Sequence, residues 1–176
     1  MQSDEQLMGE FQNGSEKAFD ELFERYKKLV YGFFRRRMSN AARAEELAQE
    51  TFIAILRGAE RYEPRARFRT YVFAIAMKQL WSERREEMRA GRVDAEAEEA
   101  SSQSDPATVL WIRGALEQLD ADRREVLMLR EYEQLTYEEI SEVLVLPVNT
   151  VRSRLSRARH DLKALLESQS ANGVSR

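Results

Sequence analysis

Residues 135–163 read LTYEEISEVLVLPVNTVRSRLSRARHDLK, and this stretch decides the fold of the second half of the chain. A short amphipathic segment, with Ile140 and Val143 on one side, is followed by Pro147. Proline suits the first turn of a new helix, because its missing N–H would have no partner there. Beyond it, apolar residues recur at steps of four, three and four: Val151, Leu155, Ala158 and Leu162. The pattern predicts two helices that meet at a tight corner, the second with one buried face.

The other side of this second helix is cationic. Residues 148–163 contain four Arg and one Lys against one Asp. The side chains that would face outward near its start are candidates for DNA contacts: Asn149, Thr150, Arg152, Ser153, Arg154 and Arg157. A donor-rich cationic helix after such a corner is typical of a helix-turn-helix whose second helix enters the DNA major groove. Taken alone, such a face is most often ordinary solvated surface.

The composition excludes several classes of protein. The net charge of the 176-residue chain is −3, so any binding of nucleic acid must come from segregated patches. The chain has no Cys and one His, His160, so we expect no disulfide framework, no metal site and no cofactor. No apolar run approaches the roughly 18 residues of a membrane span, and the first residues do not resemble a leader. We therefore expect a cytoplasmic protein with no direct membrane insertion.

Charge and composition also divide the chain. Gly and Pro are scarce, with 7 and 3 residues, so helix should dominate. Residues 57–85 carry eight basic and three acidic side chains, whereas residues 86–105 carry seven acidic and two basic ones and few large apolar residues. The second stretch cannot bury a core and is predicted to be flexible. We predict an all-α protein of two small helical domains, with boundaries at residues 10–85 (first domain), 86–107 (flexible acidic linker), 108–167 (second domain) and 168–176 (disordered tail).

The first domain should contain several amphipathic helices. They are expected at about residues 15–38, 42–59 and 70–85, after a short N-terminal turn or helix that ends near Gly14. In the helix at 42–59 the expected core residues are Leu47, Phe52, Ile55 and Leu56. The loop at 60–69 is marked by Pro64 and contains four Arg. In the second domain, Asp120 is expected to cap a helix over 121–132.

Two separated blocks resemble one family. Residues Glu45–Leu56 (EELAQETFIAIL) and Arg61–Ala76 (RYEPRARFRTYVFAIA) look like region 2 of the bacterial sigma-70 family, extracytoplasmic-function (ECF) group. Residues Leu119–Arg159 look like region 4 of the same group. Both blocks in this order, separated by an acidic linker, are highly specific. The resemblance implies an alternative RNA polymerase sigma factor, which binds core polymerase, reads a −35 promoter element and melts a −10 element.

The resemblance also implies partners and contacts. In the family, the helix that matches Glu45–Leu56 docks on the clamp helices of the largest polymerase subunit. Here an exposed acidic and polar stripe would meet those basic helices, and we assign it to Glu46, Gln49, Glu50 and Ile53. The polymerase flap, promoter DNA and an anti-sigma factor are the other expected partners, and in the holoenzyme the protein would be associated with the nucleoid.

Melting the −10 element requires groups that hold unstacked bases. Aromatic rings and guanidinium planes do so at about 1–3 kcal/mol per stacked base. We expect the flipped base to meet Tyr71 and the loop at residues 67–69, and cationic side chains further along the helix to contact the DNA backbone. The full set of −10 candidates is Arg67, Phe68, Arg69, Tyr71, Lys78, Arg84 and Arg85.

The chain departs from the family pattern at a few positions. Lys78 and Ser82 stand where the group usually has Asn and Asp, which puts the usual −10 base preference in doubt. The tight turn commonly carries Gly but here has Val145, and a β-branched residue resists a positive φ. We therefore expect this turn to adopt another backbone conformation. Asn149 replaces a second common Gly and adds a side chain that could read a base or a phosphate.

Other classes of function predict different behaviour. An autonomous helix-turn-helix repressor or activator would dimerise through the N-terminal helices and bind symmetric half-sites without polymerase. A structural adaptor would use its basic helix to bind a protein partner. An enzyme is the weakest alternative, because no nucleophile–base pair and no phosphate-binding Gly loop is visible.

Overall fold

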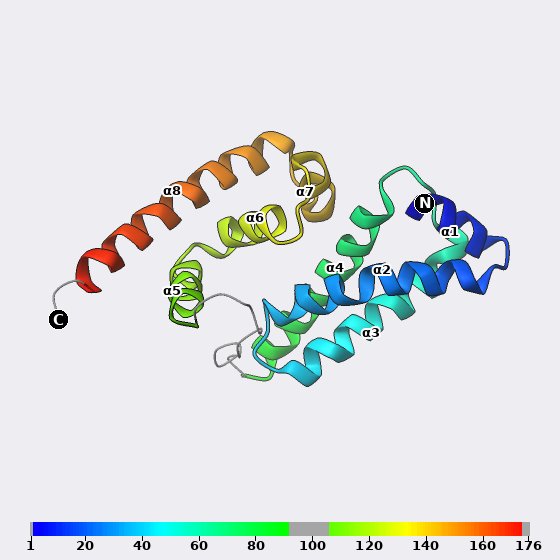
Figure 1. The fold of residues 1–176 in the computed structure, drawn as a ribbon, viewed down its shortest axis with the longest axis horizontal. Coiled ribbons are helices and arrows are strands. Elements are labelled where there is room, and N and C mark those ends of the chain that lie inside the picture. Colours follow the sequence, from blue (N-terminus) through cyan, green and yellow to red (C-terminus); the bar gives the residue numbers. More distant parts are fainter. Residues whose placement is uncertain (1, 92–105, 174–176) are drawn as a thin grey trace. The chain divides into compact units, whose positions relative to one another are not determined.

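The computed structural model describes residues 2–91 and 106–173, and every regular element in these ranges is a helix (Figure 1). The helices form two compact units that divide near residue 100. The prediction of an all-α protein with two helical domains is confirmed. Each unit is described by itself.

The N-terminal unit is a helical bundle around an aromatic core. Its elements are α1 (Asp4–Gln12), α2 (Glu16–Arg35), α3 (Ala41–Gly58), the short 3₁₀ helix η1 (Ala59–Arg61) and α4 (Phe68–Arg89). Asn40 caps α3 by accepting a hydrogen bond from the Arg43 N–H at 3.1 Å. The rings of Phe33, Phe34 and Phe73 are fully buried and contact one another between α2 and α4. This core fixes the position of α4 in the bundle.

The ends of the N-terminal unit differ from the predicted boundaries. Helix α1 begins at Asp4, and its Leu7 and Met8 are fully buried, so the packed unit includes residues before position 10. Helix α4 continues to Arg89, and α5 begins at Pro106, so both ends of the predicted linker are helical. Residues 92–105 lie outside the described residues.

The C-terminal unit contains the predicted helix-turn-helix. Its elements are α5 (Pro106–Glu117), α6 (Ala121–Glu131), α7 (Tyr137–Leu144) and α8 (Val148–Gly173). Asp120 caps α6 through the Arg123 N–H, as predicted, and Thr136 forms a capping box with Glu139 at the start of α7. Helix α8 packs against α5, α6 and α7 through Val151, Leu155 and Ala158, all buried. Leu162, which was expected on the same buried face, is half-buried.

Helix α8 is longer than the sequence predicted. We expected disorder from residue 168, but α8 continues to Gly173. The Ser-Gln-Ser-Ala run at 168–171 lacks large apolar residues, yet it contains no Pro and no helix-breaking Gly before Gly173. A helix that is already formed can add such residues, because each added residue completes one more backbone hydrogen bond without a new nucleus.

Candidate nucleic-acid and polymerase interfaces

The corner between α7 and α8 is formed by Val145 in a left-handed conformation, with φ 54° and ψ 51°. The expectation that valine would avoid this geometry is therefore wrong. Hydrogen bonds hold the turn: the Leu146 N–H donates to the Ser141 carbonyl at 3.0 Å, and the Ser141 hydroxyl donates to the Leu146 carbonyl. The Val145 side chain is 81% exposed, so its Cβ meets no packed neighbour. The contacts of the turn outweigh the local preference of valine.

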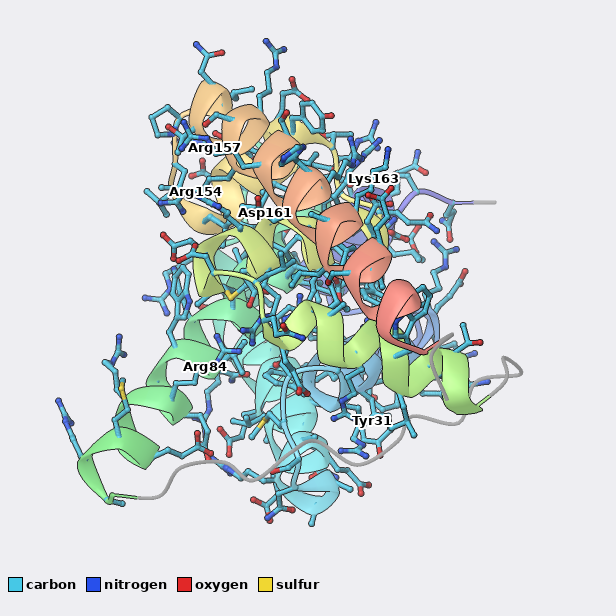
Figure 2. All side chains as sticks on the ribbon, turned by 90° about the vertical axis from the view of Figure 1, so that its left-hand side faces the viewer. Tyr31, Arg84, Arg154, Arg157, Asp161 and Lys163 are labelled. Carbon is cyan, nitrogen blue, oxygen red and sulfur yellow. The ribbon has the colours of Figure 1, made fainter. Side chains whose placement is uncertain are left out.

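The first half of α8 presents a polar surface opposite its buried face. Asn149, Arg152, Ser153 and Arg157 are exposed, while Thr150 is half-buried. The Ser153 hydroxyl donates to the Thr150 carbonyl at 3.0 Å. Arg154 and Arg157 project from this half of the helix, and Asp161 and Lys163 lie further along it (Figure 2). The structure thus brings the six predicted −35 residues together on one helical segment next to the corner.

The cations of α8 differ in their intramolecular partners. Arg154 forms an ion pair with Asp122 of α6 at 2.8 Å, and Arg159 forms one with Glu131 at 2.8 Å. The hydrogen bond from Glu131 raises the pKa of Arg159 above its ordinary value. Within the described part of the chain, neither Arg152 nor Arg157 forms an ion pair. These two guanidinium groups are available to an anionic partner as they stand.

Phe68 was predicted to contact −10 DNA, and its position contradicts this. The ring is 1% exposed and packs edge-on against Tyr26 and Tyr62, with centroid distances of 5.4 and 5.9 Å. It cannot stack on a base while it fills this core. Tyr62 and Phe73 of the same Arg-rich segment are also buried, and the sequence did not show that Phe68 belongs to the core with them.

Tyr71 lies at the boundary between this core and the surface. Its ring is half-buried and lies 5.1 Å from the ring of Tyr62. A Cβ at position 58 would come within 2.6 Å of the Tyr71 hydroxyl, so Gly58 makes room for it. Burial raises the pKa of Tyr71, and it raises the pKa of Tyr62 to about 12. Both phenols are therefore neutral hydrogen-bond donors at physiological pH.

The predicted cations of this region are distributed along α4 and the loop before it. Arg67 is exposed, and Arg69 is half-buried with its guanidinium 5.9 Å from the Phe73 ring. Lys78 and Arg85 are exposed, and Arg84 is half-buried on α4 (Figure 2). Tyr71, Lys78 and Arg85 recur at steps of seven, which places them on one side of the helix.

The predicted polymerase-binding stripe of α3 is exposed. Glu46, Gln49 and Glu50 are exposed, and Ile53 is 43% exposed. Leu47, Phe52 and Ile55 are buried, as predicted, but Leu56 is 42% exposed, so its assignment to the core is wrong. Ile55 and Leu56 are adjacent, and the bundle buries only the first of them. Leu56 therefore adds apolar area to the surface that carries Ile53.

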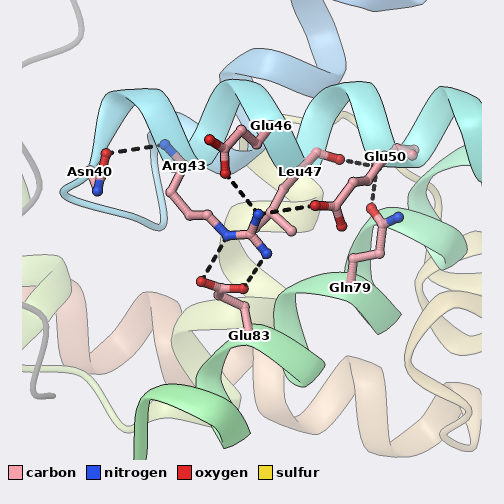
Figure 3. A network of polar contacts seen from close by, with 8 residues as sticks. Asn40, Arg43, Glu46, Leu47, Glu50, Gln79 and Glu83 are labelled. Atoms are coloured by element: carbon pink, nitrogen blue, oxygen red, sulfur yellow. Dashed lines mark hydrogen bonds and ion pairs between the residues drawn. The ribbon is translucent and has the colours of Figure 1, made fainter. Parts of the chain in front are cut away.

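The two carboxylates of this stripe are bound to Arg43, a residue that the sequence analysis did not single out (Figure 3). Arg43 Nη1 lies 2.9 Å from Glu46 and 3.0 Å from Glu50. Its Nε and Nη2 form a two-pronged contact with Glu83 of α4, at 2.9 and 2.7 Å. The hydrogen bond to Glu83 and those to the other carboxylates raise the pKa of Arg43. The network joins the acidic stripe of α3 to α4.

An apolar groove in the C-terminal unit was also missed. It opens between α5, α6 and α8 and is lined in part by Trp111, Leu127, Met128, Leu162 and Leu166. Leu162 was assigned to a buried helical face, and spacing alone does not reveal which apolar residues line an open groove.

Neither a metal-binding cluster nor a membrane-spanning helix is found in residues 2–91 and 106–173. These residues contain no group of three or more His, Cys, Asp or Glu side chains that could hold a metal ion. No helix among them is long and apolar enough to cross a bilayer.

The comparisons with known proteins match both units in order. The model for sigma-70 region 2 matches residues 22–90, and the model for sigma-70, region 4 matches residues 110–162. The RNA polymerase sigma factor CarQ of Myxococcus xanthus is 34% identical over 165 residues, which cover 90% of this chain and 95% of CarQ. The chain belongs to the sigma-70 family.

Further relatives identify the group within the family. The ECF RNA polymerase sigma-E factor of Haemophilus influenzae is 30% identical over 89% of this chain and 92% of its own length. This protein is an alternative sigma factor of the ECF group that directs promoter-specific transcription. Sigma factors of this family are DNA-binding regulators rather than enzymes of the usual kind.

A solved structure shows the same fold. The sigma factor RpoE of Bartonella quintana, solved in complex with the anti-sigma factor NepR, has a TM-score of 0.76 and 24% sequence identity. It covers 86% of this chain and 98% of its own. The sigma region 2 match begins at residue 22 and therefore does not include α1.

Proposed function

We propose that this sigma factor reads the −35 element with the first half of α8 and captures unpaired −10 bases with α4 and the loop before it. The observation that carries the proposal is the cationic, donor-rich surface of α8 beside the helix-turn-helix corner, where Arg152 and Arg157 are exposed. One bidentate contact of Arg with guanine contributes about 1–3 kcal/mol of discrimination.

The α8 residues would divide the work of −35 recognition. Asn149 and Arg152 lie near the start of the helix, where side chains of a recognition helix reach base edges. Thr150, Ser153 and Arg157 complete the surface. Arg154 would have to exchange Asp122 for DNA, and phosphate is the natural replacement because it offers the same negative charge.

The −10 contacts would combine stacking and charge. Tyr71 offers a half-buried aromatic ring, and Arg67 and Arg69 flank the start of α4. Lys78, Arg84 and Arg85 would hold the DNA backbone along the same helix. The burial of Phe68 removes it from this set and assigns it to the support of Tyr71, whose ring centroid is 6.2 Å away.

Core polymerase would bind the α3 surface formed by Glu46, Gln49, Glu50 and Ile53. Carboxylates beside an apolar residue suit the basic clamp helices that the family contacts. Polymerase would then fix the distance between the two DNA-binding units, so that two weak contacts become one specific contact.

An anti-sigma factor is a further proposed partner. The Bartonella quintana sigma factor, which shares the fold, was solved with one. The exposed cations of α8 and the acidic stripe of α3 offer charged surfaces that such a protein could cover in place of DNA and polymerase.

The test is transcription in vitro with bacterial core polymerase and sheared DNA from the source genome, with mapping of RNA 5′ ends. With this protein we expect new starts that share two upstream elements at a fixed spacing. The double variant Arg152→Ala with Arg157→Ala should lose these starts while it still binds core polymerase. New starts that survive in this variant, or no starts from an active core while the protein alone protects symmetric sites, would contradict the proposal.

A further inference from the structure

The loop before α4 is short and exposed, yet the proposed function requires it to hold a base in place. Between η1 and α4, residues 62–67 form no regular helix, and Arg65 and Arg67 are exposed. The side chain of Arg67, the residue that precedes α4, makes no capping hydrogen bond to the helix. Within the loop, the Arg65 N–H donates to the Glu63 carbonyl at 2.7 Å and the two side chains form an ion pair, but these contacts join near neighbours and do not tie the loop to another helix.

Helix α1 binds this loop at both ends. At one end, the Gln12 amide nitrogen donates to the carbonyls of Ala59 and Tyr62, each at 2.8 Å. At the other end, the Glu5 carboxylate accepts from the Phe68 N–H at 2.9 Å. The three hydrogen bonds span sequence separations of 47 to 63 residues and lie on both sides of the loop at residues 62–67.

The contact of Glu5 replaces a missing helix cap. The first N–H groups of a helix have no partner within it, and a Ser, Thr, Asp or Asn at the N-cap usually accepts from one of them. Here Arg67 cannot accept, and Glu5 supplies the acceptor from another helix. Its negative charge also interacts favourably with the N-terminal end of the α4 dipole.

Helix α1 is anchored well enough to act as a support. Leu7 and Met8 are fully buried against the bundle. Asp4 accepts hydrogen bonds from Tyr26 and from Arg25 of α2. Ser3 and Gln6 close a capping box at the start of the helix. A displacement of α1 would therefore have to break core packing as well as polar contacts.

We propose that α1 is a brace that holds the 62–67 loop and the start of α4 in the shape that receives an unpaired base of the melted strand. Glu5 and Gln12 are positioning residues in this view, and they touch no DNA. The inference rests on the proposed function, because it assumes that the loop and Tyr71 receive the base. It adds a role for a helix that lies outside the sigma region 2 match.

The experiment measures binding of the holoenzyme to two fork-junction DNA probes from a promoter mapped with the wild-type protein. One probe carries the unpaired −10 base, and the other has an abasic site in its place. The ratio of the two affinities isolates base capture from all other contacts. The variants are Gln12→Ala, Glu5→Ala and their combination, with Glu5→Gln, which keeps an oxygen acceptor, as the conservative rescue. Glu10→Ala, on the exposed side of α1, is the matched control.

We expect the double variant to lose roughly tenfold of the preference for the intact base, the scale of losing two or more hydrogen bonds. Glu5→Gln and Glu10→Ala should keep the preference, and affinity for the abasic probe should not change. Gln12→Ala alone, which alters an exposed side chain, should lose part of the preference without unfolding. If Gln12→Ala and the double variant both keep the wild-type preference for the intact base, the proposal that α1 is a brace is wrong, while the proposed −10 function stands. A wild-type holoenzyme without any preference would overturn the proposed −10 function together with it.

Discussion

The two surfaces predicted to meet charged partners differ in how far their side chains are already paired within the chain. On α8, Arg152 and Arg157 are exposed and form no ion pair with any residue in the described ranges. On α3, Glu46 and Glu50 both bind Arg43, which also binds Glu83. The Arg152 and Arg157 guanidinium groups are available to DNA as they stand, whereas Glu46 and Glu50 would have to exchange Arg43 for a cation of the proposed partner.

This difference in pairing should affect the salt dependence and the geometry of binding more than the strength of binding. Exposed ion pairs contribute about 0–1 kcal/mol each, so the exchange at α3 costs little. Unpaired cations that neutralise phosphates release counterions, so binding through α8 should weaken steeply as salt rises. Binding through α3 should depend less on salt, because one ion pair replaces another.

The largest effect should come from the buried side of α8. Leu155→Ala removes a fully buried side chain and should lower the free energy of unfolding of the C-terminal unit by about 2–5 kcal/mol. The binding surface of α8 would be lost, while the Arg43 network would remain. Trp111 reports on the C-terminal unit and Trp81 on the N-terminal unit, so urea denaturation of Trp→Phe single variants can follow each. Equal shifts of both transitions would show that the units do not unfold independently.

The next effect should separate the open cations of α8 from the paired ones. Arg152→Ala should reduce the affinity of the holoenzyme for its promoter by about 1–3 kcal/mol if the side chain reads a guanine. Arg159→Ala is the matched comparison, because Arg159 is paired with Glu131. This variant should lose less promoter affinity than Arg152→Ala. Competition binding at several salt concentrations gives both affinities and slopes. An Arg159→Ala effect as large as that of Arg152→Ala would erase the distinction between open and paired cations.

A third variant tests the corner that sets the direction of α8. Val145→Gly should stabilise the C-terminal unit by about 1 kcal/mol, because removing a strain of about 1–3 kcal/mol outweighs the greater freedom of unfolded glycine. Val145→Ala keeps a Cβ at a positive φ and should gain less. Chemical denaturation of the three proteins gives the order. If glycine is no more stable than valine, the turn does not store strain.

The smallest effect should come from the α3 surface, where Glu46 and Glu50 are paired with Arg43. Arg43→Gln should lower the free energy of unfolding by about 1 kcal/mol, because its pairs with Glu46 and Glu50 are exposed and only the Glu83 carboxylate is largely buried. It should also strengthen binding to core polymerase by a few-fold, because Glu46 and Glu50 no longer need to exchange a partner. Lys27→Gln, which breaks the exposed pair with Glu24 on α2, is the control and should leave polymerase binding unchanged. If Arg43→Gln weakens polymerase binding as much as Glu46→Gln does, Arg43 orients the carboxylates, and the exchange view is wrong.

The sequence predicted features that depend on local spacing. The buried positions Val151, Leu155 and Ala158 follow from helical periodicity, and the break before α8 follows from Pro147. The cap at Asp120 sits where a polar residue precedes a predicted helix. All six −35 candidates lie on one segment for the same reason.

The errors arose where tertiary contacts decide. Leu56 and Ile55 are neighbours in the sequence. Only the packing of the helices in the bundle determines which of the two is buried. Phe68 is fixed in the core by rings from α2 and from the loop. Val145 keeps a positive φ because Ser141 and Leu146 hydrogen-bond across the turn. In each case a local preference was correct as a tendency and was overridden by packing or by hydrogen bonds.

Other features were missed because their members are distant in sequence. Arg43 and Glu83 are 40 residues apart, and Glu5 and Phe68 are 63 apart. Charged residues are so common in this chain that no spacing singles out these pairs. Only a correct arrangement of the helices brings them within hydrogen-bond distance.

The length of α8 has a mechanical consequence. Its 26 residues form a single helix about 39 Å long, which carries the proposed −35 residues at one end and part of the apolar groove further along. A rotation of α8 about the Val145 corner would therefore move the far end of the helix furthest. A tilt of about 10° at the corner would move the far end by roughly 7 Å. A ligand that opens the groove and tilts α8 would thus change the angle at which the proposed −35 residues Arg152 and Asn149 are presented to DNA.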